Sequence, residues 1–155
     1  MQLYILRHAD ADTEAATDAA RELSEKGREQ AKKVAEFCTR HGIRPDVIFA
    51  SPLIRVQQTA KPVAKELGVE VTTARWLACG ATPEGILAQL APLKQPAAVM
   101  LVGHEPDLGN LVAHLLGGEC GSIHVRKASL TVVEVLVPRK GGGRLEFSMP
   151  VRLME

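Results

Sequence analysis

Short apolar runs alternate with longer amphipathic stretches along most of the chain. Residues 3–6, 46–50, 69–72 and 97–102 form the apolar runs, which are too short for typical helices and predict buried strands. The stretches between them place apolar residues at helical spacing and predict helices. Two later segments, residues 130–137 and 144–149, flank the glycines 141–143 and predict an antiparallel hairpin.

Local signals set the expected helix boundaries. Ser24 is expected to cap a helix that runs to about Arg40, and Gly42 is expected to end it in a left-handed conformation. Ser51 followed by Pro52 predicts a second helix, with serine as the cap and proline at the first helical position. Pro62 should kink that helix or shift its boundaries. Further helices are expected over residues 83–90 and from 106 to the glycines 117–118.

Alternation of strands and helices predicts an α/β protein with helices on both faces of a sheet. We expect a three-layer α/β/α sandwich whose central sheet is mostly parallel and is extended by the C-terminal hairpin. A length of 155 residues predicts one domain, residues 1–155. The stretch from residue 9 to 20 is expected to be a loop, with one helical turn, that runs over the carboxyl edge of the sheet.

Composition narrows the classes of partner. The formal net charge is +1 and aromatic residues make up only 3%, so neither a charge field nor stacking platforms for nucleic acid are expected. Apolar runs of membrane-spanning length and a signal-peptide pattern are both missing from the sequence. The three cysteines are widely spaced and form no Cys-x-x-Cys pair, which favours reduced thiols in the cytoplasm.

Candidate chemistry gathers where the predicted strands end. Arg7 and His8 follow the first strand, His104 follows the fourth, and Arg55 lies in the first turn of the helix after the second. Ligands of open α/β sheets bind at the carboxyl ends of strands, so these side chains are expected to converge. Two cations and two imidazoles suit a tetrahedral dianion, with one imidazole attacking phosphorus and the other stabilising the transferred group.

Each of these residues also has an ordinary structural interpretation when it is taken alone. A histidine after a strand is often a surface residue, and an arginine in a first helical turn is usually solvated. A metal site built from His8, His104, Asp10 and Asp12 is disfavoured because Arg7 and Arg55 would oppose a divalent cation. Glycine-rich nucleotide loops are missing from the sequence, and its cysteines do not follow strand ends, so nucleotide binding and thiol chemistry are not expected.

Several stretches together resemble one known family. They are Arg7-His8-Ala9, Leu23-Ser24-x-x-Gly27-x-x-Gln30-Ala31, Ser51-Pro52-Leu53-x-Arg55-x-x-Gln58-Thr59-Ala60 and Val102-Gly103-His104. This combination resembles the histidine phosphatase superfamily, whose fold is the phosphoglycerate mutase-like one. Small size and Gly103-His104-Glu105-Pro106 resemble its SixA-type phosphohistidine phosphatase branch.

The resemblance implies roles for individual residues. His8 would be the phosphorylated nucleophile, with Arg7, Arg55 and His104 binding the phosphoryl group. Arg21 resembles a further phosphate-contacting arginine. Ala9 departs from the glycine that is usual there, and a methyl group would restrict the backbone if that position required positive φ.

Many superfamily members carry a glutamate general acid in an insert that corresponds here to residues 72–85. That region is short, and its only carboxylate, Glu84, is expected to begin a helix rather than reach a leaving group. An alkoxide needs a proton donor, whereas imidazole has an unperturbed pKa of ~6.5 and leaves readily. The sequence therefore predicts an enzyme that acts on phosphohistidine in a protein and needs neither a cofactor nor a metal. It is expected to work as a monomer. Asp12 or His104 is expected to guide the attacking water. A phosphatase for small phosphomonoesters, or a non-catalytic module that binds phosphorylated proteins, stays open as an alternative.

Overall fold

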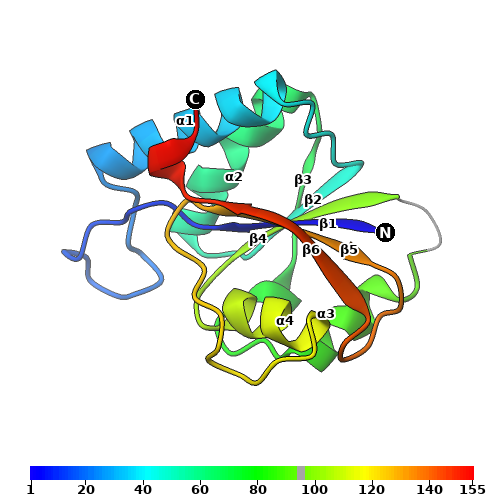
Figure 1. The fold of residues 1–155 in the computed structure, drawn as a ribbon. Coiled ribbons are helices and arrows are strands. Elements are labelled where there is room, and N and C mark those ends of the chain that lie inside the picture. Colours follow the sequence, from blue (N-terminus) through cyan, green and yellow to red (C-terminus); the bar gives the residue numbers. More distant parts are fainter. Residues whose placement is uncertain (94–96) are drawn as a thin grey trace.

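A six-stranded sheet lies between two pairs of helices (Figure 1). The computed structural model describes residues 1–93 and 97–155. The spatial order of the strands is β3-β2-β4-β1-β5-β6. Their bounds are Gln2–Arg7 for β1, Val47–Ala50 for β2, Val71–Thr73 for β3, Ala98–Gly103 for β4, Leu130–Val135 for β5 and Gly143–Met149 for β6.

Strand β1 lies near the middle of the sheet and joins its two parts. It pairs in parallel with β4, with Arg7 opposite Gly103, and antiparallel with β5. Strand β4 also pairs in parallel with β2, which in turn pairs in parallel with β3 at the edge. Strands β5 and β6 form the expected hairpin. The prediction of a mostly parallel sheet extended by an antiparallel hairpin is confirmed.

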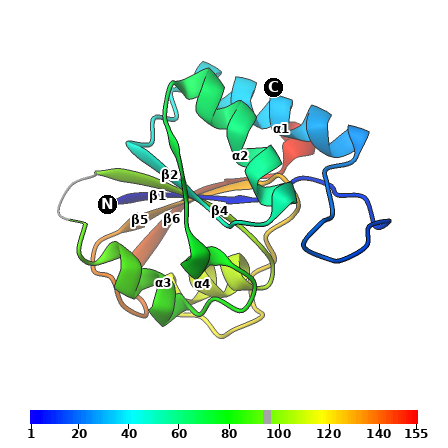
Figure 2. The ribbon, with the colours of Figure 1, turned by 180° about the vertical axis from the view of Figure 1, so that it is seen from behind.

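The helices cover both faces of this sheet, as the three-layer prediction required. Helices α1 and α2 lie on one face and α3 and α4 on the other, which is clear from both sides of the molecule (Figures 1 and 2). They span Glu25–Arg40, Ile54–Leu67, Pro83–Leu90 and Asp107–Leu115. Each face buries its own apolar cluster, represented by Leu6 and Met100 under α1 and α2 and by Ile5 and Leu101 under α3 and α4.

Two of the expected helix boundaries are confirmed, and one is wrong. Ser24 caps α1 by accepting a hydrogen bond from the Gly27 amide, and Gly42 after the helix has a φ of 68°. Helix α2, however, begins at Ile54 rather than at Pro52, and its N-cap residue Leu53 provides no side-chain cap.

The Ser51 hydroxyl lies 2.7 Å from Nε2 of His104 at the end of β4 and accepts only a long hydrogen bond, 3.5 Å, from the Leu53 amide, so it caps the chain weakly and the regular helix begins later. Pro62 does not move the end of α2, which runs through it to Leu67.

The segment between β1 and α1 is a loop that lies at the carboxyl edge of the sheet, as predicted. It contains no regular helix, but the amides of Ala20 and Arg21 donate to the carbonyls of Thr17 and Asp18 and form a single turn. A single antiparallel bridge between Ala11 and Leu23 closes its base. Within the described residues, no helix has the length and apolar character needed to cross a membrane.

Candidate active site

The ends of β1 and β4 bring two histidines together. Because Arg7 and Gly103 are paired in register, His8 and His104 leave neighbouring strands at the same level. Their ring centroids are 5.6 Å apart and the ring planes meet at 60°. Both side chains are buried, with 6% of His8 and 3% of His104 exposed. The predicted convergence of the two strand ends is therefore present in the structure.

The ring of His8 is held in one orientation by its own backbone. Nδ1 lies 2.8 Å from the carbonyl oxygen of Ala9, which can only accept a hydrogen bond. Nδ1 therefore carries the proton, and the lone pair is at Nε2. Burial is the main cause that lowers the pKa of His8 to about 4; the hydrogen bond to Ala9 raises it, and the nearby Arg55, His104 and Arg7 contribute to the lowering. His8 is consequently a neutral imidazole at pH 7, the form that can act as a nucleophile.

His104 is held through its other ring nitrogen. Nε2 lies 2.7 Å from the Ser51 hydroxyl at the end of β2. Burial also lowers the pKa of His104 to about 4, and Arg55 adds to the effect. Nδ1 of His104 is buried and has no hydrogen-bond partner among the described residues. When the Ser51 hydroxyl donates to Nε2, Nδ1 carries the proton and can donate to an anion.

Arg7 and Arg55 each use an Nη atom in a hydrogen bond to a backbone carbonyl, whereas Nε of each has no hydrogen-bond partner among the described residues. Arg7 donates from Nη1 to the carbonyl of Val125 at 3.0 Å, and Arg55 is only 4% exposed. Nε of both arginines is buried without a partner within residues 1–93 and 97–155. An unpaired buried polar group costs about 1–3 kcal/mol, so these donors are expected to meet an acceptor in function. An oxyanion fits them.

Asp18 reaches over from the loop between β1 and α1 and bridges two arginines. Its Oδ2 lies 3.1 Å from Nη2 of Arg55, and its Oδ1 lies 3.2 Å from Nη1 of Arg21. Arg55 also donates to the Asp18 carbonyl at 2.8 Å. Arg21 first, and then Arg55, lower the pKa of Asp18. One carboxylate thus spans Arg21 and Arg55, so both guanidinium groups are within reach of a single anion.

Thr59 positions the backbone that follows His8, a role that the sequence did not predict. Its hydroxyl donates to the Arg55 carbonyl at 2.8 Å and accepts from the Ala9 amide at 3.0 Å. Thr59 is fully buried. One hydroxyl therefore ties the helix that carries Arg55 to the backbone that orients His8. The only sign of this role in the sequence was that Thr59 follows Gln58 in the stretch that resembles the family.

Two glutamines hold the rest of the same loop. The Gln30 side chain accepts from the Asp10 amide at 2.9 Å, and the Gln58 side chain accepts from the Leu23 amide at 2.7 Å. Gly27 lies so close to Asp10 that a Cβ there would overlap the Asp10 carbonyl. The spacing of serine, glycine and glutamine around the start of α1 thus serves to pack the helix against the strand end.

The remaining expectations have mixed outcomes. Among the described residues outside glycine, only Ala128 has a positive φ, so the methyl group of Ala9 meets no backbone restriction. Glu84 begins α3 as expected, and its carboxylate lies 3.8 Å from Nδ1 of His114. The Asp12 side chain is exposed and has no hydrogen bond or ion pair in the described part of the chain. Water guidance by Asp12 therefore has no geometric support.

The side chains considered as metal ligands do not gather into a metal-binding cluster among the described residues. Over residues 1–93 and 97–155, no three His, Cys, Asp or Glu side chains are grouped so that they could hold a metal ion. Asp10, one of the residues considered as a ligand, instead accepts hydrogen bonds from Lys127 and Ser24.

Comparisons with known proteins show which family this chain is similar to. Residues 3–78 match the model of the histidine phosphatase superfamily (branch 1). Phosphohistidine phosphatase SixA of Escherichia coli is 28% identical over 96% of this chain and 93% of its own length. The phosphohistidine phosphatase SixA homolog of Haemophilus influenzae is 30% identical over 76% of this chain and 78% of its own length.

A solved structure shares the whole fold. The protein histidine phosphatase SixA, complexed with tungstate, superposes with a TM-score of 0.88 at 24% identity and covers 100% of both chains. At that identity the likeness establishes the fold alone. Taken with the similar sequences, it identifies this chain as a member of the histidine phosphatase superfamily, in its SixA-type branch of phosphatases.

Proposed function

We propose that this chain hydrolyses phosphohistidine on a protein through a phosphorylated His8. One observation carries the proposal: His8 is a neutral imidazole whose Nδ1 proton is held by the Ala9 carbonyl, beside unpartnered donors of Arg7, Arg55 and His104. A nucleophile with a free lone pair next to donors for three oxygens is the arrangement that phosphoryl transfer needs.

In the first step, Nε2 of His8 attacks phosphorus. The bond from phosphorus to the substrate imidazole breaks. Because the other nitrogen of that ring already carries a proton, the ring departs with the bonding electron pair as neutral imidazole. Arg7, Arg55 and His104 bind the equatorial oxygens, which carry the negative charge of the transition state. Arg21 adds a fourth donor, because the Asp18 contact brings Arg21 and Arg55 within reach of one anion.

In the second step, water attacks the phosphorus of phospho-His8. The bond to Nε2 breaks, inorganic phosphate leaves, and His8 returns to the neutral form. Its low pKa favours this return because burial disfavours the imidazolium. His104 contacts the phosphoryl oxygens in both steps through Nδ1.

Among the described residues, the Asp18 carboxylate contacts the arginines of the site, but its lowered pKa keeps it ionised, so it has no proton to give to a leaving group. This favours an N–P bond as the substrate. Glu84 is tied into the first turn of α3 beside His114, and its side chain is 73% exposed. An alkoxide leaving group would need the proton that this residue is not positioned to give, whereas imidazole does not. The phosphohistidine phosphatase names of the similar proteins support the same substrate class.

The proposal extends to the conditions under which the enzyme works. Two guanidinium groups supply the positive charge that a divalent cation supplies elsewhere, so activity should persist without metal. Cys38, Cys79 and Cys120 are unpaired, which fits the reducing cytoplasm. We expect the enzyme to act as a monomer there.

Phosphate release from a panel of substrates tests the proposal. A phosphohistidine-bearing protein and phosphoramidate should be hydrolysed at least about 100-fold faster than a sugar phosphate or another alkyl phosphomonoester, whose alkoxide leaving group needs a proton. Excess EDTA should leave the rate unchanged, and His8→Ala should abolish it. Faster turnover of the phosphomonoesters would overturn the substrate assignment, and binding of phosphoproteins without turnover would favour a binding module.

A further inference from the structure

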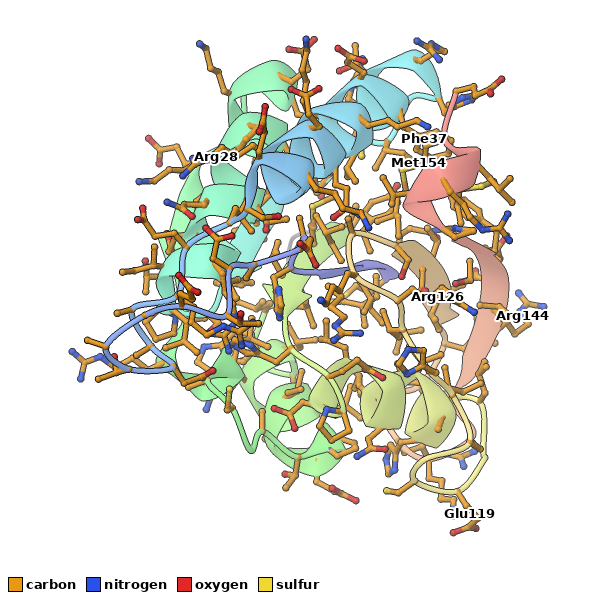
Figure 3. The ribbon with its side chains drawn as sticks, turned by 90° about the vertical axis from the view of Figure 1, so that its left-hand side faces the viewer. Arg28, Phe37, Glu119, Arg126, Arg144 and Met154 are labelled. Carbon is orange, nitrogen blue, oxygen red and sulfur yellow. The ribbon has the colours of Figure 1, made fainter. Side chains whose placement is uncertain are left out.

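A groove with an excess of positive charge opens beside Arg7. Its volume is about 450 Å³. Six basic side chains contribute to its lining, namely those of Arg7, Lys26, His124, Arg126, Lys127 and Arg152. We call this the basic groove. Figure 3 faces the carboxyl edge of the parallel strands and shows Arg126 on this side of the molecule.

The positive charge of the basic groove is only slightly compensated within the protein. Asp10 is the one acidic residue in its lining, and that carboxylate already pairs with Lys127 at 2.8 Å. Lys26, Arg126 and Arg152 are exposed and have no ion pair in the described part of the chain. The whole chain carries a net charge of only +1, so the excess is a local feature. Such a concentration of one sign attracts a ligand of the opposite sign.

The groove shares Arg7 with the candidate phosphoryl site, and it shares other lining residues with a second hollow. Arg7 lines the groove and directly precedes His8. The second hollow, of about 520 Å³, shares Lys26 and Arg152 with the groove and follows α1 past Lys32 and Lys33. This space is longer than a phosphoryl group requires. It suits a stretch of polypeptide that extends away from the reacting histidine.

We propose that the basic groove binds acidic side chains that flank the phosphohistidine of the substrate protein. The inference rests on the proposed function and adds to it the charge of the partner surface. An acidic protein fits better than nucleic acid because the described lining contains no Phe, Tyr or Trp side chain on which a base could stack.

Two matched peptides test the inference. Both carry one phosphohistidine, formed with phosphoramidate, and they differ only in having Asp and Glu or Asn and Gln at the flanking positions. Wild type should hydrolyse the acidic peptide with a KM about tenfold lower at low salt, and the difference should shrink as salt screens the charges. Equal KM values for the two peptides would overturn the inference while leaving the proposed function intact.

Charge-reversal variants locate the effect in the groove. Arg126→Glu combined with Arg152→Glu should remove the preference for the acidic peptide. Lys61→Glu combined with Lys65→Glu makes the same change of charge on the exposed side of α2 and should keep the preference. All three proteins should hydrolyse phosphoramidate at equal rates. Loss of the preference in the α2 variant alone would overturn the assignment to this groove.

A binding measurement separates this inference from the reaction itself. Unphosphorylated forms of the two peptides, labelled with a fluorophore, report affinity by anisotropy without any turnover. Wild type should bind the acidic form more tightly, and Arg126→Glu/Arg152→Glu should lose this difference. That outcome supports the groove even if neither phosphorylated peptide is hydrolysed. Lack of hydrolysis would overturn only the proposed function. A single-stranded oligonucleotide that binds the groove more tightly than the acidic peptide would overturn the choice of a protein partner.

Discussion

The ends of β1 and β4 carry the same residue in similar surroundings but hold it in opposite ways. His8 bonds to the backbone through Nδ1, whereas His104 bonds to the Ser51 hydroxyl through Nε2. Burial is the main cause of the lowered pKa of both imidazoles, which are neutral at pH 7. The difference therefore lies in which nitrogen is left free, Nε2 in His8 and Nδ1 in His104.

This difference assigns different tasks to two chemically identical side chains. A carbonyl oxygen can only accept, so it forces Nδ1 of His8 to hold the proton and leaves a lone pair for attack. A hydroxyl can donate or accept, so Ser51 permits His104 to present a proton at Nδ1. The comparison teaches that the hydrogen-bond partner on the far side of the ring, rather than the residue type, separates a nucleophile from an oxyanion donor.

Removing the second imidazole should slow the reaction without preventing phosphorylation. His104→Ala takes away one donor to the transferring oxygens, for which a loss of about 10²–10³ in kcat is expected. Phospho-His8 should still form in that variant. His41→Ala, at an exposed position after α1, is the matched control and should retain full activity. Complete loss of phosphorylation in His104→Ala would show that the two histidines do not have separate tasks.

The imidazoles of His8 and His104 should gain their protons over the same pH range. Each pKa is lowered to about 4, so each ring is neutral above that value and gains its proton only as the pH falls through it. We expect kcat/KM to be flat from about pH 5.5 to 8 and to fall about tenfold for each pH unit below 4, because protonation of His8 removes its lone pair whereas protonated His104 still donates from Nδ1. NMR titration of the imidazole carbons, assigned with His8→Ala and His104→Ala, checks this. A ring that titrates near ~6.5 would contradict the burial argument.

Ser51→Ala should weaken the reaction only through His104. Losing this hydrogen bond frees the ring to rotate or change tautomer, and a fall of up to about tenfold in kcat is expected. The same substitution in the His104→Ala background should have no further effect, because the interaction is already absent. Additive losses in the double variant would mean that Ser51 acts on something other than His104.

The smallest expected effect concerns Asp18. Its carboxylate occupies Arg21 and Arg55, which the proposed mechanism assigns to the phosphoryl oxygens. Asp18→Asn removes that competing charge, so inhibition by inorganic phosphate should become about two- to fivefold tighter. Glu14→Gln, which changes another exposed carboxylate of the same loop, should leave the inhibition constant unchanged. Weaker inhibition in Asp18→Asn would mean that Asp18 supports the anion site instead of competing for it.

The parts of the molecule that follow from short-range rules could be predicted from the sequence. Apolar runs placed the strands, and strand ends placed His8 and His104 at one edge of the sheet, because parallel strands share a direction. The loop between β1 and α1 could not be derived in the same way. Its contact between Asp18 and Arg55 joins residues that are 37 positions apart and depends on no local pattern.

The one wrong helix boundary follows Ser51. Serine followed by proline is a local signal for a helix start, yet the helix begins at Ile54. The hydrogen bond of the Ser51 hydroxyl to His104, which is 53 positions away, could not be predicted from any local pattern. Thr59 was missed for the same reason, since its partner Ala9 lies 50 positions away in sequence.

Labelled phosphate gives the most direct test of the central claim, that the Nδ1-anchored ring of His8 is the nucleophile. A rapid-quench experiment with a ³²P-labelled phosphohistidine protein, stopped in alkaline denaturant, should leave transient label on the peptide that contains His8. His8→Ala should carry no label and release no phosphate. Label on another residue, or sustained phosphate release by His8→Ala, would contradict the account.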